Sequence, residues 1–246
     1  VYETVSETLP NVSAFNFTKT AFYKQAWTGV TVRARGLFLA TATNAIVARG
    51  WDKYFNRGQR RETSDEALMR NLTYPIVGYV KENGFLGVTG YDEETGRLVV
   101  GSKARLEGHF AKWFETILRD TLGDAGMERL LRFNRDQVAS CDFEVIDPVN
   151  DPHIIEEARP RVVLLDAIRR DAVFESMPYE DLLKLGAHLG CEVKRTAFKN
   201  IPNWEALKRI MDQIENDEAW RPNKGGSQVE GVVIVDAAGF MFKVKA

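Results

Sequence analysis

The apolar residues of this chain occur in short runs that alternate with polar residues and end at turn signals. Phe85–Thr89 and Arg97–Val100 flank the turn Tyr91–Gly96, and Val229–Val235 and Phe240–Lys245 flank a second short turn. Alternation with period two predicts half-buried strands, and turns this short join antiparallel neighbours. We therefore expect sheets built from hairpins.

Other segments carry apolar residues at helical spacing. Helices are expected over His109–Leu122, ended by Gly123, and over Ala125–Phe133, Pro178–Leu189 and Trp204–Ile214, the last with Asn203 as N-cap. Further strands are expected at Thr31–Thr41, Asn44–Arg49, Pro75–Val80, Cys141–Ile146 and Arg161–Ile168, and an exposed loop at Gln59–Glu66. Strands outnumber helices, which predicts an α+β fold of antiparallel sheets flanked by helices.

Composition narrows the class of protein. The chain has 33 Lys and Arg against 35 Asp and Glu, a net charge of -2, so bulk positive charge cannot hold it to nucleic acid. Its two cysteines, Cys141 and Cys191, predict free thiols in a reducing, intracellular compartment rather than a disulfide framework. No apolar run approaches the roughly 18 residues of a membrane helix, so we expect no membrane partner.

The usual phosphate-binding and hydrolytic motifs are absent from the sequence, including the P-loop, the Rossmann glycine pattern, G-x-S-x-G and H-E-x-x-H. Lysine placement is the feature that stands out instead. Lys81 lies between two apolar strands, and Lys243 and Lys245 alternate on the last strand, which puts them on one face. Glu144 and Glu230 each lie in or beside an apolar strand. Taken singly, each is most simply an edge-strand charge.

The order of these residues resembles the covalent nucleotidyltransferase superfamily of RNA ligases, DNA ligases and mRNA capping enzymes. The matching elements are Lys81-Glu-Asn-Gly84, Ser102-Lys103, Phe143-Glu144-Val145, Glu230-Gly-Val-Val-Ile234 and Lys243-Val-Lys245. Ala34-Arg35-Gly36-Leu37-Phe38 and Asp52-Lys53-Tyr54-Phe55-Asn56 resemble a narrower group, the phage RNA ligases that mend cleaved tRNA and the fungal tRNA-splicing ligases. The resemblance covers roughly residues 31–245 and implies the nucleotidyltransferase (ligase adenylation domain) fold.

The resemblance also implies a reaction in three steps. Lys81 attacks ATP to give lysyl-AMP and pyrophosphate, AMP passes to an RNA 5′-phosphate, and an RNA 3′-hydroxyl displaces AMP. A lysine attacks only when neutral, and neighbouring cations and partial burial lower a lysine pKa from its usual value near 10.4. Mg²⁺ or Mn²⁺ is the implied metal, and the carboxylates of Glu144 and Glu230 are expected to hold it directly or through water. The implied ATP-binding residues are Arg35, Lys53, Asn83, Gly84, Lys103, Glu144, Val163, Leu165, Glu230, Lys243 and Lys245.

Within that set the resemblance assigns roles. Lys243 and Lys245 contact the α-phosphate, while Arg35 and Lys53 reach the β- and γ-phosphates. Lys103 supports the phosphate site, and Gly84 leaves room for the nucleotide. Val163 or Leu165 covers the adenine, although a core strand would have the same sequence. Asn83 replaces the Asp of many relatives and supplies no charge, a mark of the tRNA-ligase-like branch.

The motif order predicts one adenylyltransferase domain over residues 1–246, with 1–30 as an N-terminal cover segment. The chain begins at Val1 and stops one residue after Lys245, so we expect a fragment of a longer protein, without an OB or other C-terminal domain. The expected partner is RNA with 5′-phosphate and 3′-hydroxyl ends, in particular tRNA, and end-healing domains are expected to be fused in the full-length protein.

Two other functions stay open. One is a GTP-dependent guanylyltransferase of the capping type, and the other is a non-catalytic RNA-binding descendant of the fold. The aromatic-rich segment 13–27 is open to two interpretations as well, because it can stack RNA bases or, as is more common, pack over the core.

Overall fold

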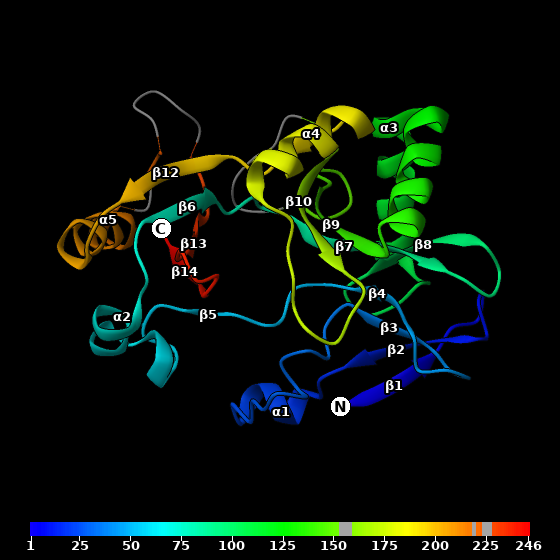
Figure 1. The fold of residues 1–246 in the computed structure, drawn as a ribbon, viewed down its shortest axis with the longest axis horizontal. Coiled ribbons are helices and arrows are strands. Elements are labelled where there is room, and N and C mark those ends of the chain that lie inside the picture. The colour runs from blue at the N-terminus through cyan, green and yellow to red at the C-terminus, as the bar shows by residue number, and fades with distance from the viewer. Residues whose placement is uncertain (153–158, 218–219, 223–227) are drawn as a thin grey trace. The chain divides into compact units, whose positions relative to one another are not determined.

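A computed structural model describes residues 1–152, 159–217, 220–222 and 228–246 of the chain. The described part contains fourteen strands and five α-helices, and its strand pairs are antiparallel except for two, which confirms the α+β prediction (Figure 1). The residues divide into two compact units. Unit 1 comprises Val1–Lys53 and Gly84–Val193, and unit 2 comprises Tyr54–Asn83 and Lys194–Ala246. Because each unit is built from two separate stretches, the chain passes from one to the other three times. The single catalytic domain stays a prediction.

The larger sheet of unit 1 is covered on one face by two helices, α3 (His109–Asp136) and α4 (Tyr179–Leu189) (Figure 1). Its strand order is β11 (Glu192–Val193), β10 (Arg161–Arg169), β9 (Ala139–Ile146), β7 (Phe85–Asp92) and β8 (Arg97–Ser102). Alternate residues of β9, namely Cys141, Phe143 and Val145, pack into the helix-side core. The intervening Asp142 and Glu144 therefore lie on the opposite face.

The second sheet of unit 1 contains the N-terminal strands in chain order, β1 (Tyr2–Val5), β2 (Val12–Asn16), β3 (Leu37–Ala40) and β4 (Ile46–Arg49). The short helix α1 (Lys19–Tyr23) follows β2. The strand expected at Thr31–Thr41 is too long by six residues at its start. Gly36 adopts a φ of +62°, outside the strand region, so the extended chain begins only at Leu37.

Unit 2 is one five-stranded sheet with helices beside it. The strand order is β12 (Thr196–Ile201), β6 (Ile76–Val80), β13 (Gly231–Val235), β14 (Met241–Lys245) and β5 (Phe55–Asn56). The apolar stripe of α5 (Trp204–Asn216) packs into the same core as Phe242 and Val244 of β14. Asn203 accepts a hydrogen bond from the backbone N–H of Ala206, as its predicted N-cap role requires.

The two helices expected on either side of Gly123 are confirmed, since α3 consists of two helices joined at a kink where Gly123 has non-helical angles (φ 64°, ψ 175°). The loop expected at Gln59–Glu66 is partly helical, with a 3₁₀ turn at Arg61–Thr63 and α2 (Asp65–Asn71). The Ser64 hydroxyl accepts from the backbone N–H of Ala67 and starts α2. In the described part of the chain, no helix is long and apolar enough to cross a membrane.

Candidate active site

The predicted nucleophile lies at one end of the sheet of unit 2, where three strands bring distant residues together. Val80, the last residue of β6, pairs with Val232 of β13, and Gly231 pairs with Lys245 of β14. The backbone N–H of Lys81 continues this ladder, since it donates to the carbonyl oxygen of Gly231 at 3.0 Å. Strand register therefore brings residues 81, 230 and 245 to the same end of the sheet.

Glu230 links two lysines at this end. Its Oε2 is paired with Lys81 Nζ, and its Oε1 lies 2.7 Å from Lys245 Nζ. Burial opposes ionisation of the Glu230 carboxyl, but the charges and hydrogen bonds of Lys81 and Lys245 outweigh it and hold its pKa below the usual value. The side chains of Lys81 and Glu230 are only 20% and 25% exposed, so the pair is partly shielded from water.

Gly231 is required by this arrangement. Its φ is +153°, and a Cβ atom there would lie 2.1 Å from the carbonyl oxygen of Val244 and 2.8 Å from Lys245 Cα. Any side chain would push β14 away from Glu230. The Glu-Gly pair is therefore a geometric unit that keeps Lys245 beside the carboxylate.

Lys243 lies two residues before Lys245, on the same face of β14. Phe242 and Val244 point into the core beside α5, so both lysines lie on the sheet face away from that helix. Lys243 Nζ lies 5.6 Å from the ring centroid of Tyr54, a cation–π contact. Sequence reasoning missed Tyr54 as a partner, although it directly follows the predicted Lys53.

The two residues after Lys81 are buried. Glu82 is 3% exposed and accepts two hydrogen bonds from the Arg195 guanidinium, at 2.8 and 3.0 Å. The backbone N–H of Val80 also donates to the carbonyl of Arg195, so the segment on both sides of Lys81 is tied to the start of β12. Asn83 follows at 9% exposure. The interaction of Glu82 with Arg195 was not foreseen from the sequence.

In unit 1, Gly84 lies against β9. Its backbone N–H donates to Glu144 Oε1 at 3.0 Å, and a Cβ atom there would come within 2.2 Å of the carbonyl oxygen of Val145. The resemblance implies that Gly84 leaves room for a nucleotide. Here its missing side chain already makes room for the β9 backbone, and Glu144 is bonded to the loop that follows the nucleophile.

The two predicted adenine-covering residues lie on the face of β10 that is turned away from α3 and α4. Val163 pairs with Glu144, and it is 1% exposed. Leu165 stands at a bulge between Leu164 and Asp166. Since Leu164 and Ala167 both pack into the helix-side core, the bulge leaves Leu165 on the opposite face at 6% exposure.

Three predicted triphosphate-binding cations gather in unit 1. The backbone connects their segments, because Gly36 N–H donates to the carbonyl of Lys103 and Lys53 N–H donates to the carbonyl of Val32. Burial, then the charges of Arg35 and Lys103, lower the pKa of Lys53 to about 8. Burial and Arg35 also lower the pKa of Lys103. Like charges that disfavour one another in this way make a local site for an anion.

Lys53 also lies against aromatic rings. Its Nζ lies 4.9 Å from the ring centroid of Trp27 and 5.9 Å from that of Phe22. These rings belong to the segment that sequence analysis left between two interpretations, and the contacts link that segment to the cations.

The predicted metal ligands form no ready-made cage. Among the residues that the structure describes, no group of three or more His, Cys, Asp and Glu could hold a metal ion. Both oxygens of Glu230 are bound to lysines, and Glu144 is bound to Gly84. A Mg²⁺ ion held here would thus depend on phosphate oxygens and water besides one carboxylate, which is the usual manner of Mg²⁺ binding with nucleotides.

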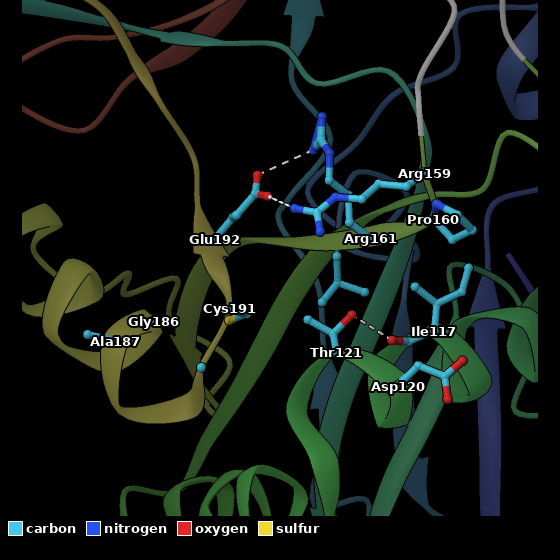
Figure 2. A pocket seen from close by; sticks show the side chains of 12 residues that line it. Ile117, Asp120, Thr121, Arg159, Pro160, Arg161, Gly186, Ala187, Cys191 and Glu192 are labelled. Atoms are coloured by element: carbon cyan, nitrogen blue, oxygen red, sulfur yellow. Dashed lines mark hydrogen bonds and ion pairs between the residues drawn. The ribbon is translucent and has the colours of Figure 1, made fainter.

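Unit 1 also contains a pocket whose lining includes none of the predicted site residues (Figure 2). It is lined by Ile117 and Thr121 of α3, by Val162 of β10 and by the end of α4, so it opens on the helix side of the sheet. The Arg159 and Arg161 guanidinium groups at its rim share Glu192, at 3.6 and 3.5 Å. Within unit 1, Glu144 and Val163 lie on the other face of this sheet.

Comparison with known proteins gives one family and a set of related folds. A sequence model of a family described as RNA ligase matches residues 33–246. An archaeal ATP-dependent RNA ligase has a TM-score of 0.63 at 17% identity over 100% of this chain and 58% of its own. The Naegleria gruberi RNA ligase with PPi has a TM-score of 0.57 at 16% identity, over 80% of this chain and 56% of its own. Another structure of that ligase, with ATP and Mn, has a TM-score of 0.56 at 18% identity, over 74% and 52%.

This chain thus spans little more than half the length of these solved ligases. Among curated proteins, none matches it. The likenesses confirm the ligase-type nucleotidyltransferase fold that the order of motifs predicted.

Proposed function

We propose that this chain, which belongs to the RNA ligase family, is the adenylyltransferase part of an ATP-dependent RNA ligase. The observation that carries the proposal is the cluster of Lys81, Glu230 and Lys245 in unit 2. It joins the predicted nucleophile to the last two motifs of the family resemblance, which lie about 150 residues further along the chain.

In the proposed first step, a Lys81 Nζ lone pair attacks the α-phosphorus of ATP. An N–P bond forms, the bond from the α-phosphorus to the bridging oxygen breaks, and pyrophosphate leaves. The Lys81 ammonium must first lose a proton, and Glu230 is the carboxylate in contact with it. Lys243 and Lys245 are assigned to the charge on the α-phosphate, and Arg35, Lys53 and Lys103 to the leaving pyrophosphate. That one ATP molecule contacts all of them stays a prediction from the order of motifs.

A divalent metal fits this assignment through Glu230. Bound Mg²⁺ or Mn²⁺ would add charge stabilisation at the phosphates. Each oxygen of Glu230 is in contact with one lysine and has a second lone pair, so Glu230 could share an oxygen with the metal or exchange a lysine for it. The Naegleria gruberi ligase with ATP and Mn supports the choice of ATP and a divalent metal as the bound groups. Glu144 accepts from the backbone of Gly84 through Oε1, and its carboxylate has further lone pairs that could accept from a metal-bound water.

The later steps concern the longer protein. We propose that AMP passes from Lys81 to an RNA 5′-phosphate, and that an RNA 3′-hydroxyl then displaces it. A tRNA substrate and fused end-healing domains are the finer proposals, and both rest on the resemblance of Arg35-Gly36 and Lys53-Tyr54-Phe55-Asn56 to tRNA-repair and tRNA-splicing ligases. An intracellular location is part of the same proposal, supported by two cysteines that are both free thiols.

Labelling with nucleotides labelled at the α-phosphate tests the proposal. The protein is incubated with either ATP or GTP in the presence of Mg²⁺ or Mn²⁺, without RNA. We expect label from ATP on the protein, released by acid and stable to alkali as a phosphoramidate should be. Label from GTP alone would favour the capping-type alternative, and no label from either nucleotide would favour a non-catalytic descendant.

Replacement of the nucleophile gives the sharper control. Lys81→Ala should abolish labelling, because no other group replaces its Nζ atom. Lys112→Ala removes an exposed lysine of α3 and should label like the wild type. Normal labelling of Lys81→Ala would refute the assignment of Lys81.

A further inference from the structure

The N-terminal part of unit 1 has an unusual distribution of charge. Residues 8–51 contain no Asp or Glu, although 35 of the 246 residues of the chain are acidic. The same 44 residues contain five cations, Lys19, Lys24, Arg33, Arg35 and Arg49. A near-neutral protein thus carries one continuous stretch of sequence whose own charges are all positive, and such a stretch suits a polyanion. Arg33 and Arg49 pair with Asp52 directly after it, whereas Lys19 and Lys24 are exposed.

Two aromatic residues of this stretch are exposed. Tyr23 is 77% exposed and Phe22 is 41% exposed, both at the end of α1. Their rings meet edge to face at 5.4 Å, and Trp27 meets Phe17 in the same way at 5.0 Å. The exposed faces of Phe22 and Tyr23 leave flat apolar surface in water, and exposed apolar surface of this kind often marks a binding surface.

The local fold explains why the rings face outward. The Thr18 hydroxyl accepts from the backbone N–H of Ala21 and starts α1, and Ala21 is the buried residue of that helix. With Ala21 turned inward, Phe22 and Tyr23 are left on the outside, together with the exposed Lys19 and Lys24. The common interpretation of segment 13–27, a cover packed on the core, therefore fails for these two rings.

The rings contact the group of cations in unit 1 through Lys53. Lys53 Nζ lies over both Trp27 and Phe22, and Lys53 is electrostatically coupled to Arg35 and Lys103. A nucleic acid strand lying over the rings would meet Lys53 against Phe22 and Trp27, and the exposed Lys19 and Lys24 on and directly after the helix that carries Phe22 and Tyr23. Proteins that hold single strands combine stacking rings and a cationic groove in this way.

We propose that residues 17–35 form a binding surface for single-stranded RNA, on which the rings of Phe22 and Tyr23 stack unpaired bases and Lys19 and Lys24 contact phosphates. The inference deepens the proposed function and rests on it for the choice of RNA. Unpaired bases are required because the faces of paired bases are stacked inside the duplex.

Binding of a fluorescent twelve-nucleotide single-stranded RNA to the full chain, measured by anisotropy, tests this surface. Tyr23→Ala and Phe22→Ala should each weaken binding at least about fivefold, the effect of losing one stacked base. Phe240→Ala is the matched control, since Phe240 is 37% exposed but lies outside the basic stretch, and it should bind like the wild type. Circular dichroism of each variant shows that it is folded.

A duplex of the same sequence separates stacking from general charge attraction. We expect the two ring variants to bind the duplex as the wild type does. Unchanged single-strand binding in folded Tyr23→Ala and Phe22→Ala would overturn the proposal, and so would an equal loss on single strand and duplex. A third result would also overturn it: the wild type binds phosphatidylserine vesicles but not RNA, and both ring variants lose the vesicle binding. Labelling of the wild type with ATP alone needs no RNA, so its failure would reject the proposed function independently.

Discussion

At the scale of the residue, Lys53 shows how a residue of the predicted triphosphate site can lower the stability of the fold. Its pKa in the folded protein is about 8, lowered from 10.5 by burial and by the charges of Arg35 and Lys103. Between these two values the unfolded chain binds a proton that the folded chain does not. Folding stability attributable to Lys53 therefore rises as the pH rises from 8 to 10.5, and at neutral pH the charged Lys53 is a net cost.

Lys53→Met should accordingly stabilise the protein at pH 7, by roughly 1–3 kcal/mol, because the apolar side chain keeps the packing against Trp27 without a buried charge. The gain should shrink as the pH rises above 8, where Lys53 itself becomes neutral. Urea unfolding at pH 7 and pH 9.5 measures both effects. The exposed Lys112→Met serves as control and should change little. A loss of stability in Lys53→Met at pH 7 would contradict the argument.

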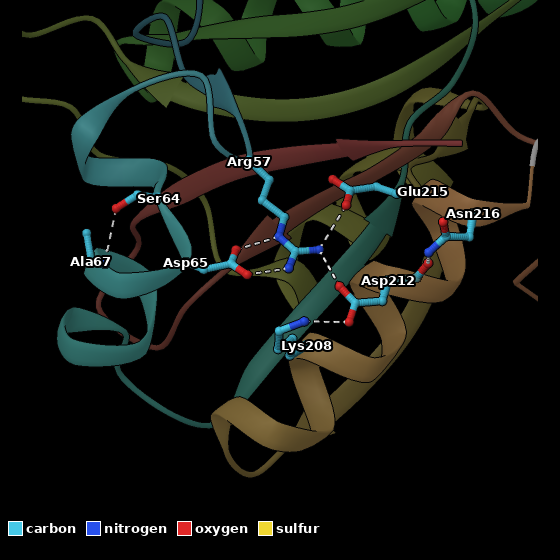
Figure 3. A network of polar contacts seen from close by, with 8 residues as sticks. All are labelled: Arg57, Ser64, Asp65, Ala67, Lys208, Asp212, Glu215 and Asn216. Carbon is cyan, nitrogen blue, oxygen red and sulfur yellow. Dashed lines mark hydrogen bonds and ion pairs between the residues drawn. The ribbon is translucent and has the colours of Figure 1, made fainter.

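At the scale of the element, Arg57 holds four parts of unit 2 together (Figure 3). Its guanidinium makes two bonds of 2.6 Å to Asp65 of α2, and it reaches Asp212 and Glu215 of α5 at 2.8 and 2.9 Å. Arg57 directly follows β5, and its backbone N–H donates to the carbonyl of Lys243 on β14. Hydrogen bonding to Asp65 raises the pKa of Arg57, and the same bond lowers that of Asp65.

Arg57→Met should therefore destabilise the chain by about 1–2 kcal/mol, since it removes several charge-assisted hydrogen bonds of a side chain that is only 9% exposed, while the three carboxylates, each 40–42% exposed, can still be hydrated. Because the pKa of Asp65 lies below its ordinary 3.8 in the folded protein, the stability from this pair is present above that pH and is lost as the pH falls below it. Chemical unfolding at pH 7 and pH 3 measures the loss and its decrease with acid.

Arg70→Met is the matched comparison for Arg57→Met. Arg70 forms one exposed pair with Glu66 on the same helix α2, with side chains 68% and 77% exposed, so its removal should cost at most about 0.5 kcal/mol. Equal effects of the two substitutions would show that Arg57 is an ordinary surface charge.

The elements that could be predicted from sequence are those whose pattern is local. β6, β9, β10, β13, β14, α4 and α5 lie within a few residues of their expected places, because alternation or helical spacing marks them directly. β5 and β11 are two residues long and exist through parallel pairing with distant strands, which leaves no local pattern. The expected strand at Thr31–Thr41 failed at Gly36, whose left-handed conformation alternation does not reveal.

At the scale of the whole molecule, the sequence predicted the residues of the candidate site better than their contacts with other segments of the chain. The order of motifs identified Lys81, Glu230 and Lys245, and strand register in unit 2 brings them together. Glu82 with Arg195 and Tyr54 with Lys243 could not be predicted, because each pair joins segments that are far apart in sequence and share no motif. The division into two units, each of two stretches, was equally hidden.

The net charge of the whole molecule is a poor guide to whether it binds RNA. The chain carries -2 overall, yet residues 8–51 hold five cations and no acid, so the other 202 residues hold 28 basic and 35 acidic residues. If the segment and not the total charge governs binding, two double variants of equal net charge must behave differently. Lys19→Glu with Lys24→Glu places acids inside the basic stretch, whereas Lys112→Glu with Lys184→Glu places them on exposed positions of α3 and α4.

We expect the first pair to weaken single-strand RNA binding more than tenfold and to reduce the slope of log K against log salt by about 1.4, or roughly 0.7 for each RNA phosphate that the protein no longer neutralises. The second pair should keep both the affinity and the slope of the wild type within about twofold, since surface charges beyond a Debye length of about 10 Å are screened at 0.1 M salt. Titrations at several salt concentrations measure both quantities. Equal decreases in affinity for the two variants would mean that the overall charge of the molecule, and not the acid-free segment, controls its encounter with RNA.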